Sequence, residues 1–183
     1  MIIINSQLLK EARGDSPAEL VLKNCKIIDV FNEEIYEDNL AISFGKIIGV
    51  GEYQGRREID LEGKILAPSF IDGHLHLESA MVPVEEFAQK AISLGTTTIV
   101  ADPHEIANVA GLKGIKYILE KGLKMPWNFN LMLPSCVPSS KFETGGSILN
   151  ANELKKMIDK EGIFGLGEVM DYPGVINGDK KLW

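Results

Sequence analysis

The organisation of this chain turns on the run Ser69-Phe70-Ile71-Asp72-Gly73, a strand-like segment that begins directly after Pro68 and leads into His74-Leu75-His76. From this point on, strand-like runs alternate with helical runs. Such alternation is typical of βαβ units, because two parallel strands need a crossover connection between them. The second part of the chain is therefore predicted to be an α/β structure with a parallel sheet.

We expect strands at 69–73, 96–101, 127–133 and 163–169, helices at 83–94, 106–122 and 150–161, and a loop at 134–147. The first helix has a proline near its start, acidic residues in its first turn and Gly95 as its stop signal. Asn150 or Asn152 is expected to cap the last helix. Four such units are half of an eight-stranded (β/α)8 TIM-like barrel, which typically needs ~250 residues. Residues 68–183 are thus predicted to be the first four β/α units of an incomplete barrel.

The residues before Pro68 follow a different pattern. Short strand-like runs lie close together at 19–22, 26–30, 39–44, 46–50 and 57–61, after a helix or arm within 1–17. In the third run Leu40, Ile42 and Phe44 alternate with smaller residues, which predicts a strand with one buried face. Gly45 and Lys46 then predict a tight hairpin turn. We expect residues 1–67 to form an N-terminal arm and a small β-rich domain.

Composition excludes several classes of function. The chain has 183 residues, 45% of them hydrophobic and 25% charged, and a net charge of −7. Nucleic acid and anionic membranes are unexpected partners, because an acidic protein without a basic run offers them no positive field. No apolar stretch approaches the ~20 residues that span a bilayer. The two cysteines, Cys25 and Cys136, are too few for a disulfide framework, and we expect a cytoplasmic protein.

His74 and His76 stand at the carboxyl end of the first barrel-type strand. Residues two apart in an extended chain point to the same face, so both imidazoles could meet one cation. Zn, Fe and Mn-class ions accept such ligands at about 2.0–2.2 Å, and parallel barrels carry their reactive groups at strand C-termini. We interpret the pair as a divalent metal site; the alternative is two incidental surface histidines.

Polar clusters also follow the second and fourth strands. His104 and Glu105 come after Asp102-Pro103, and we expect His104 to be close to the metal or to face the substrate. Asp102 and Glu105 have either a functional role or a capping role. Glu168 follows Gly167, and as an inward carboxylate it would need a cation beside it. A metal would satisfy that need, and a paired Lys or Arg is the alternative.

Four separated motifs carry a resemblance to a known family: His74–Ser79, Asp102–Val109, Pro134–Pro138 and Gly167–Asp171, in this order. Together with the run from Leu66 to His76, they resemble the metal-dependent amidohydrolase superfamily and, within it, the adenine deaminase family. The resemblance extends from about Glu19 to the end of the chain. It implies that residues 1–67 include part of the small β-sandwich domain that precedes the barrel in that superfamily.

The resemblance implies a hydrolytic deamination of adenine to hypoxanthine and ammonia, a purine-salvage reaction. By its pattern His74 and His76 would hold one metal, and Glu168 would bridge to a second. We expect Glu168, His104 and Glu105 to be catalytic, and Glu78 and His104 to bind the purine. The complete site would be binuclear, with Mn or Fe as the expected metals and Zn as a further candidate.

The family pattern also draws two metal-binding histidines from strands five and six and an aspartate from strand eight. Only four barrel strands are expected here, so the working hypothesis is an N-terminal fragment that is inactive alone. A missing C-terminal barrel half or a homo-oligomer would complete it. Alternatives are another amidohydrolase, such as a cyclic-amide hydrolase or a deacetylase, and a non-catalytic half-barrel assembly subunit. A cytidine-deaminase type of zinc site is rejected, because Cys136 stands at the wrong offset for its P-C-x-x-C half.

Overall fold

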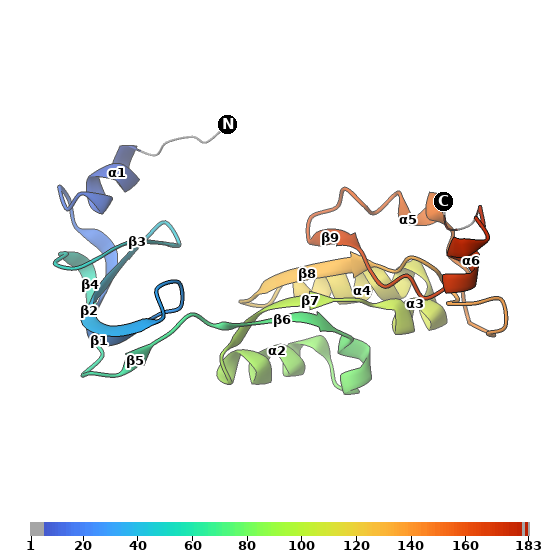
Figure 1. Cartoon of the computed structure of the whole chain (residues 1–183), viewed down its shortest axis with the longest axis horizontal. Coiled ribbons are helices and arrows are strands. Elements are labelled where there is room, and N and C mark those ends of the chain that lie inside the picture. The colour runs from blue at the N-terminus through green and yellow to red at the C-terminus, as the bar shows by residue number, and fades with distance from the viewer. Residues whose placement is uncertain (1–5, 181, 183) are drawn as a thin grey trace. The chain divides into compact units, whose positions relative to one another are not determined.

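The chain consists of two compact units, Met1–Pro68 and Ser69–Trp183. Figure 1 shows them in a computed structural model, which describes residues 6–180 and 182. In these residues no helix is long and apolar enough to cross a bilayer.

The N-terminal unit is a mixed sheet of five strands beside one short helix. Its elements are α1 (Ser6–Ala12), β1 (Ala18–Asp29), β2 (Glu34–Ser43), β3 (Lys46–Val50), β4 (Gly55–Asp60) and β5 (Ile65–Leu66). The strand order is β3-β2-β1-β4, with β5 also pairing with β1. β1 runs antiparallel to β2 and parallel to β4 and β5. Within residues 6–68 this is a single sheet, so the β-sandwich stays a prediction.

The predicted one-sided alternation in residues 39–44 is wrong. Ala41 and Ser43 are fully buried, Leu40 is buried as well, and Phe44 is 44% exposed. Side chains pack on both faces of this sheet, because Ala41 belongs to one small apolar cluster and Leu40 to another. The predicted runs 19–22 and 26–30 are also one strand, β1, with a register shift between Leu22 and Cys25. The predicted hairpin turn at Gly45 lies between β2 and β3.

A buried carboxylate connects α1 to the sheet. The side chain of Glu11 is wholly buried, and it accepts hydrogen bonds from Gln7 Nε2 at 2.9 Å and Arg56 Nη1 at 2.9 Å. Hydrogen bonds with Ser43, Gln7 and Arg56, in that order of weight, lower the pKa of Glu11 from 4.5 to about 2, although burial opposes them. A carboxyl with a lowered pKa stabilises the fold only while it is ionised.

We therefore expect an acid-sensitive N-terminal unit. The contribution of Glu11 is complete above pH 4.5, the ordinary pKa, and is lost as the pH falls toward about 2, the pKa in the folded chain. Glu11→Gln should lower the urea midpoint at pH 7 and should flatten its decline between pH 4.5 and 2. Glu33→Gln, at an exposed turn, is the matched control and should behave as the unchanged chain. Parallel pH profiles for all three proteins would contradict this assignment.

The C-terminal unit is built on a parallel sheet of order β6-β7-β8-β9. Its elements are β6 (Phe70–Leu75), η1 (Leu77–Ala80), α2 (Val84–Ser93), β7 (Thr96–Ala101), α3 (His104–Ala110), α4 (Leu112–Gly122), β8 (Asn128–Leu133), α5 (Ala151–Leu154), β9 (Ile163–Leu166) and α6 (Tyr172–Ile176). The core lies between the sheet and its helices, where Ile99, Leu131 and Ile115 are fully buried. The predicted α/β class with four parallel strands of a partial barrel is confirmed.

Two of the predicted helices differ from those observed. The helix predicted at 106–122 is two helices, α3 and α4, separated by Gly111, whose φ of 59° lies in the left-handed region that favours glycine. A Cβ at this position would also collide with the hydroxyl of Ser147. The helix predicted at 150–161 is regular only at Ala151–Leu154. Its start is as expected, because Asn150 caps it by accepting from the backbone of Asn152 and Glu153.

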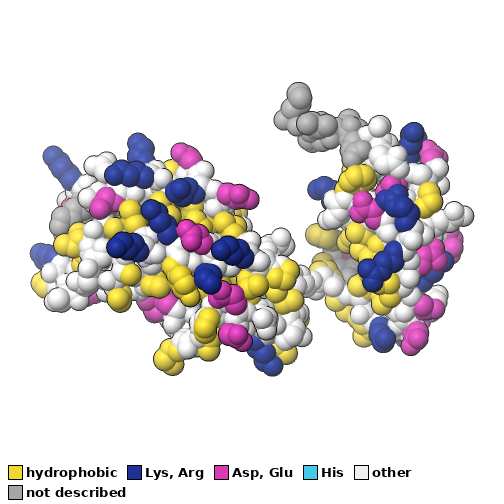
Figure 2. Space-filling view, turned by 180° about the vertical axis from the view of Figure 1, so that it is seen from behind, with side chains coloured by type: hydrophobic (Ala, Val, Ile, Leu, Met, Phe, Trp, Pro, Cys, Tyr) yellow, Lys and Arg dark blue, Asp and Glu magenta, His cyan; other side chains and the backbone are white. Residues whose placement is uncertain are grey.

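All four parallel strands end at the same edge of the sheet, and this edge carries the polar motifs. β6 is followed by His76, β7 by Asp102, β8 by Pro134 and β9 by Gly167. In the view of Figure 2, Lys and Arg side chains lie among acidic and hydrophobic ones, and no histidine is visible on that face. The edge of the sheet at the strand C-termini is therefore where the chemistry of this unit is concentrated.

Candidate metal centre

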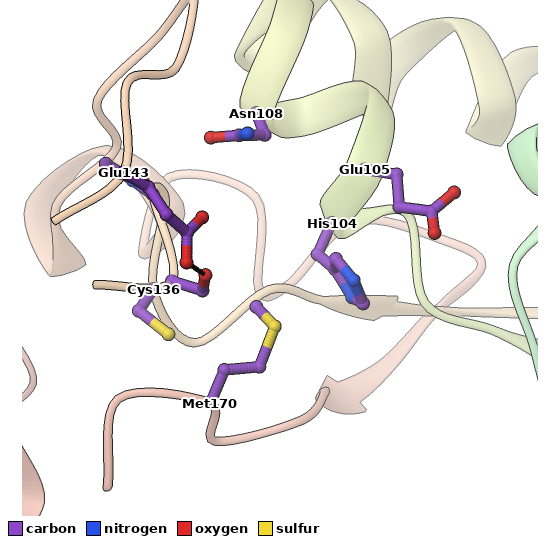
Figure 3. A pocket seen from close by; sticks show the side chains of 8 residues that line it. His104, Glu105, Asn108, Cys136, Glu143 and Met170 are labelled. Atoms are coloured by element: carbon purple, nitrogen blue, oxygen red, sulfur yellow. Dashed lines mark hydrogen bonds between the residues drawn. The ribbon is translucent and has the colours of Figure 1, made fainter. Parts of the chain in front are cut away.

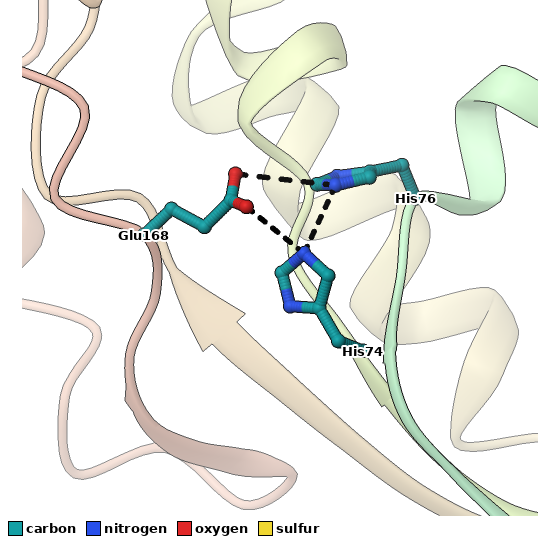
Figure 4. Close-up of side chains that lie close together, drawn as sticks. All are labelled: His74, His76 and Glu168. Atoms are coloured by element: carbon teal, nitrogen blue, oxygen red, sulfur yellow. Dashed lines mark hydrogen bonds and ion pairs between the residues drawn. The ribbon is translucent and has the colours of Figure 1, made fainter.

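Three predicted ligands converge at the strand C-termini. The Nε2 atoms of His74 and His76 lie 3.2 Å apart. The carboxylate of Glu168 places Oε1 3.1 Å from His74 Nε2 and Oε2 4.0 Å from His76 Nε2. Figure 4 shows the two imidazoles, from the end of β6, facing the Glu168 carboxylate, which comes from the segment after β9. The structure thus brings together the three side chains that the sequence assigned to the metal.

A hydrogen bond on the far side of the ring from the cluster fixes the orientation of the His76 imidazole. Its Nδ1 lies 2.8 Å from the carbonyl oxygen of Asp102, which can only accept, so Nδ1 is assigned as the protonated nitrogen. In the neutral imidazole Nε2 is then the nitrogen that carries the lone pair, and it faces His74 and Glu168. A histidine whose second nitrogen donates to a carbonyl is the usual arrangement for a metal ligand.

His104 and Asp102 form a second donor group on the same carboxylate. His104 Nδ1 lies 3.5 Å from Asp102 Oδ1 and 3.5 Å from Glu168 Oε2. Asp102 is fully buried, and both its Oδ1 and the Nδ1 of His104 are buried without a hydrogen-bond partner. Glu168 is therefore shared by two groups of potential ligands, His74-His76-Glu168 and Asp102-His104-Glu168.

These residues fit a divalent cation. Two nitrogens 3.2 Å apart subtend about 100° at an ion ~2.1 Å from each, which is close to a tetrahedral angle. Imidazole and carboxylate donors together suit Zn, Fe and Mn. The buried, unpartnered atoms of Asp102 and His104 are the kind of polar atoms that an ion would satisfy. The donor set thus agrees with the chemistry predicted from the sequence.

Glu78 and Glu105 belong to neither group of potential ligands. Glu78 Oε1 accepts from the backbone N–H of Ile106 at 3.0 Å and so caps the first turn of α3. Glu105 Oε2 accepts from the hydroxyl of Ser79 at 2.5 Å. Both contacts join η1 to the start of α3, the helix that carries His104. The predicted substrate contact of Glu78 and catalytic role of Glu105 stay predictions.

Two hydroxyls that the sequence interpretation did not assign also hold the site. Ser79 binds Glu105, and Ser135 donates a hydrogen bond to the carbonyl oxygen of Glu168. Both serines stand inside the quoted motifs, so their positions were available in the sequence. The hydrogen-bond partners of these serines could not be predicted from the sequence, because each bond joins segments that only the fold brings together.

A cavity of about 270 Å³ opens beside His104. Figure 3 shows His104, Glu105 and Asn108 entering it from α3, opposite Cys136, Glu143 and Met170. Pro138 and Ser139 complete the lining. The wall is apolar where Cys136, Pro138 and Met170 lie and polar at Glu143, whose carboxylate accepts from the Ser139 hydroxyl. Small-molecule sites combine such a partly apolar wall with a few placed polar groups.

The loop that forms this wall packs directly against α3. The backbone N–H of Gly146 donates to the carbonyl of Asn108 at 2.8 Å. A Cβ at Gly145 would collide with the side-chain oxygen of Asn108, and one at Gly146 with the carbonyl of Val109. The two glycines therefore permit the close approach that places the loop over the cavity.

Fold and site together define a class: an α/β-barrel protein with a candidate histidine–carboxylate metal site at the C-terminal ends of its strands. The chain belongs to the amidohydrolase family, whose model matches residues 65–182. The family resemblance predicted from the four motifs is confirmed.

Comparison with known proteins gives relatives at high identity. The chain is 62% identical over 179 residues to the adenine deaminase of Petrotoga mobilis and 52% identical over 174 residues to that of Clostridium acetobutylicum. These matches cover 98% and 95% of this chain but only 31% and 30% of the relatives. The N-acyl-D-glutamate deacylase of Bordetella bronchiseptica has the same fold, with a TM-score of 0.51 and 19% identity over 88% of this chain and 40% of that one.

Proposed function

We propose that this chain supplies one part of the active site of an enzyme that hydrolyses adenine to hypoxanthine and ammonia, in purine salvage. The observation that carries the proposal is the convergence of His74, His76 and Glu168. The identity of 62% to an adenine deaminase supports the choice of substrate. Hydrolases of other cyclic amides share the metal chemistry, but no contact of the described residues favours them over a purine deaminase.

In the proposed reaction, a water oxygen forms a bond to C6 of adenine and the bond from C6 to the exocyclic nitrogen breaks. His74, His76 and Glu168 would hold a divalent cation, which would lower the pKa of water toward ~7 and so supply hydroxide at neutral pH. Ammonia leaves only after its nitrogen gains a proton, which requires a positioned acid–base group. Glu168 and His104 lie at the cluster, and Glu105 lines the adjoining cavity, so we assign the proton transfers to this group of residues.

We place the purine in the cavity beside His104. Its volume of about 270 Å³ is at the lower end of the ~300–1,000 Å³ of ligand sites, which suits a free base better than a nucleoside. The apolar wall would cover the faces of the ring. Glu143 and Asn108 are then available for its polar edge. His104 would stand between ring and cluster.

We further propose that Mn or Fe occupies the site, with Zn as a third candidate, and that two ions are bound in the complete enzyme. The remaining ligands would come from the part of the protein that corresponds to the rest of the relatives, since this chain spans about a third of their length. The N-terminal unit would then be part of a small β-sandwich domain. The free, buried Cys25 and Cys136 support a cytoplasmic location.

A chimaera tests the proposed function. The homologous segment of the Petrotoga mobilis adenine deaminase is replaced by this chain, and the protein is loaded with Mn or Fe. We expect adenine to be consumed and one ammonia to be released for each hypoxanthine formed, as measured by chromatography and an ammonia assay. The 183-residue chain with the same salts should show no turnover. A folded, metal-loaded chimaera that leaves adenine unchanged would refute the proposal.

A further inference from the structure

Asp102 contacts three residues of the candidate metal centre, although its side chain is fully buried. Its carbonyl oxygen accepts from His76 Nδ1 at 2.8 Å. Its Oδ2 accepts from the backbone N–H of Glu168 at 2.8 Å. Its Oδ1 lies 3.5 Å from His104 Nδ1. One residue at the end of β7 therefore touches side chains or backbone from the ends of β6, β9 and α3.

The Asp102 carboxylate packs closely against the backbone at Gly167. A Cβ at Gly167 would collide with Asp102 Oδ2 and would lie 2.7 Å from Cγ, so only glycine permits this approach of the two strand ends. The residue that follows is Glu168, and its backbone N–H points at Oδ2 as a result. Asp102 therefore holds Glu168 through the backbone of that residue.

The ion-pair partner of the Asp102 carboxylate is the imidazole of His104, at 3.5 Å. Among residues 6–180 and 182, the ion pairs of Asp102 include no lysine or arginine. Burial of an ionised carboxylate costs several kcal/mol unless it is paired and hydrogen-bonded. Oδ2 is satisfied by Glu168, whereas Oδ1 has no hydrogen bond. The side chain thus has one atom bound to the protein and one atom turned toward the centre.

We propose that Asp102 is the positioning residue of this centre: its carbonyl and carboxylate together orient His76, Glu168 and His104 for the cation. The inference rests on the proposed metal site but not on the identity of the substrate. A residue that orients ligands in this way changes metal affinity by 10- to 100-fold when it is replaced. A residue that only fills the core changes stability and leaves the ligands of the folded protein in place.

Asp102→Asn is the decisive variant, because the amide oxygen can still accept from Glu168 while the charge facing His104 is lost. Made in the chimaera, it should weaken Mn binding by about 10- to 100-fold, as measured by titration of the metal-free protein. Cooperative unfolding in urea should be retained. Deamination should recover in part at high Mn concentration, where the weakened site is refilled, and the KM for adenine should change little. Asp159→Asn removes an exposed charge of the same unit and should leave both metal affinity and rate unchanged.

A second variant covers the case in which Asp102→Asn does not fold. Gly167→Ala changes neither Asp102 nor any proposed ligand, but its methyl group would displace the Asp102 carboxylate, so it should also weaken Mn binding. Mn affinity within about twofold of the unchanged protein in either folded variant would overturn the proposal. Failure of the unchanged chimaera to deaminate adenine would refute the proposed function alone, because Mn affinity is measured without substrate.

Discussion

His76→Asn should abolish high-affinity metal binding while leaving the C-terminal unit folded. Asparagine carries its amide nitrogen where histidine carries Nδ1, so the hydrogen bond to the Asp102 carbonyl can survive. What disappears is Nε2, the atom 3.2 Å from His74 Nε2. Since even the outer partners of a metal ligand are worth 10- to 100-fold in affinity, loss of the ligand itself should cost at least about 100-fold. Deamination by the chimaera should fall to background.

His74→Asn and His76→Ala complete this comparison. His74 is about half exposed, and His74→Asn should lose the metal with little change in stability. His76→Ala removes both the ligand and the bond to Asp102, so it should lose the metal and also lower the urea midpoint. The measurements are metal content after dialysis and urea unfolding followed by circular dichroism. A His76→Asn protein that retains a stoichiometric metal ion would contradict the assignment of His76 as a ligand.

The sequence predicted the C-terminal unit well because its signals are local. In the strand at Thr96–Ala101 every residue but the last is β-branched, and the helix at Val84–Ser93 lies between Pro83 and Gly95. The short reach of these signals also explains the errors. Nothing local distinguishes Gly111 in a broken helix from Gly114 in a continuous one; the positive φ at Gly111 accompanies the approach of Ser147, which is remote in sequence.

The same limit applies to the site. The spacing of His74 and His76 could be interpreted directly, because an extended strand fixes which side chains share a face. The position of Glu168 followed from the rule that parallel strands end at one edge of the sheet. The fully buried state of Asp102 and the turn of Glu78 toward Ile106 could not be derived, because both depend on contacts between segments. The sequence thus indicated the proposed ligands, and the structure was needed to identify the residues that contact them.

Substitution of Glu168 should also reduce the deamination rate strongly. Two variants separate the contribution of its charge from that of its side-chain length. One carboxylate faces three imidazoles, with Oε1 3.1 Å from His74 and Oε2 3.5 Å from His104 and 4.0 Å from His76. Glu168→Gln keeps the length of the side chain but removes the negative charge that faces the three imidazoles. We expect deamination by the chimaera to fall by about 10²–10⁴, the range for loss of an acid–base group. Metal content should fall from two equivalents to one or none.

Glu168→Asp keeps the charge and withdraws it by one methylene, about 1.5 Å. A backbone shift could restore the reach, but the backbone of Glu168 is held on both sides: its N–H donates to Asp102 Oδ2 and its carbonyl accepts from Ser135. We therefore expect Glu168→Asp to be nearly as inactive as Glu168→Gln, whereas Glu161→Gln, an exposed control, should match the unchanged chimaera. Activity of Glu168→Asp within about tenfold of the unchanged protein would mean that charge alone suffices. In that case the bridging geometry assigned to Glu168 would be wrong.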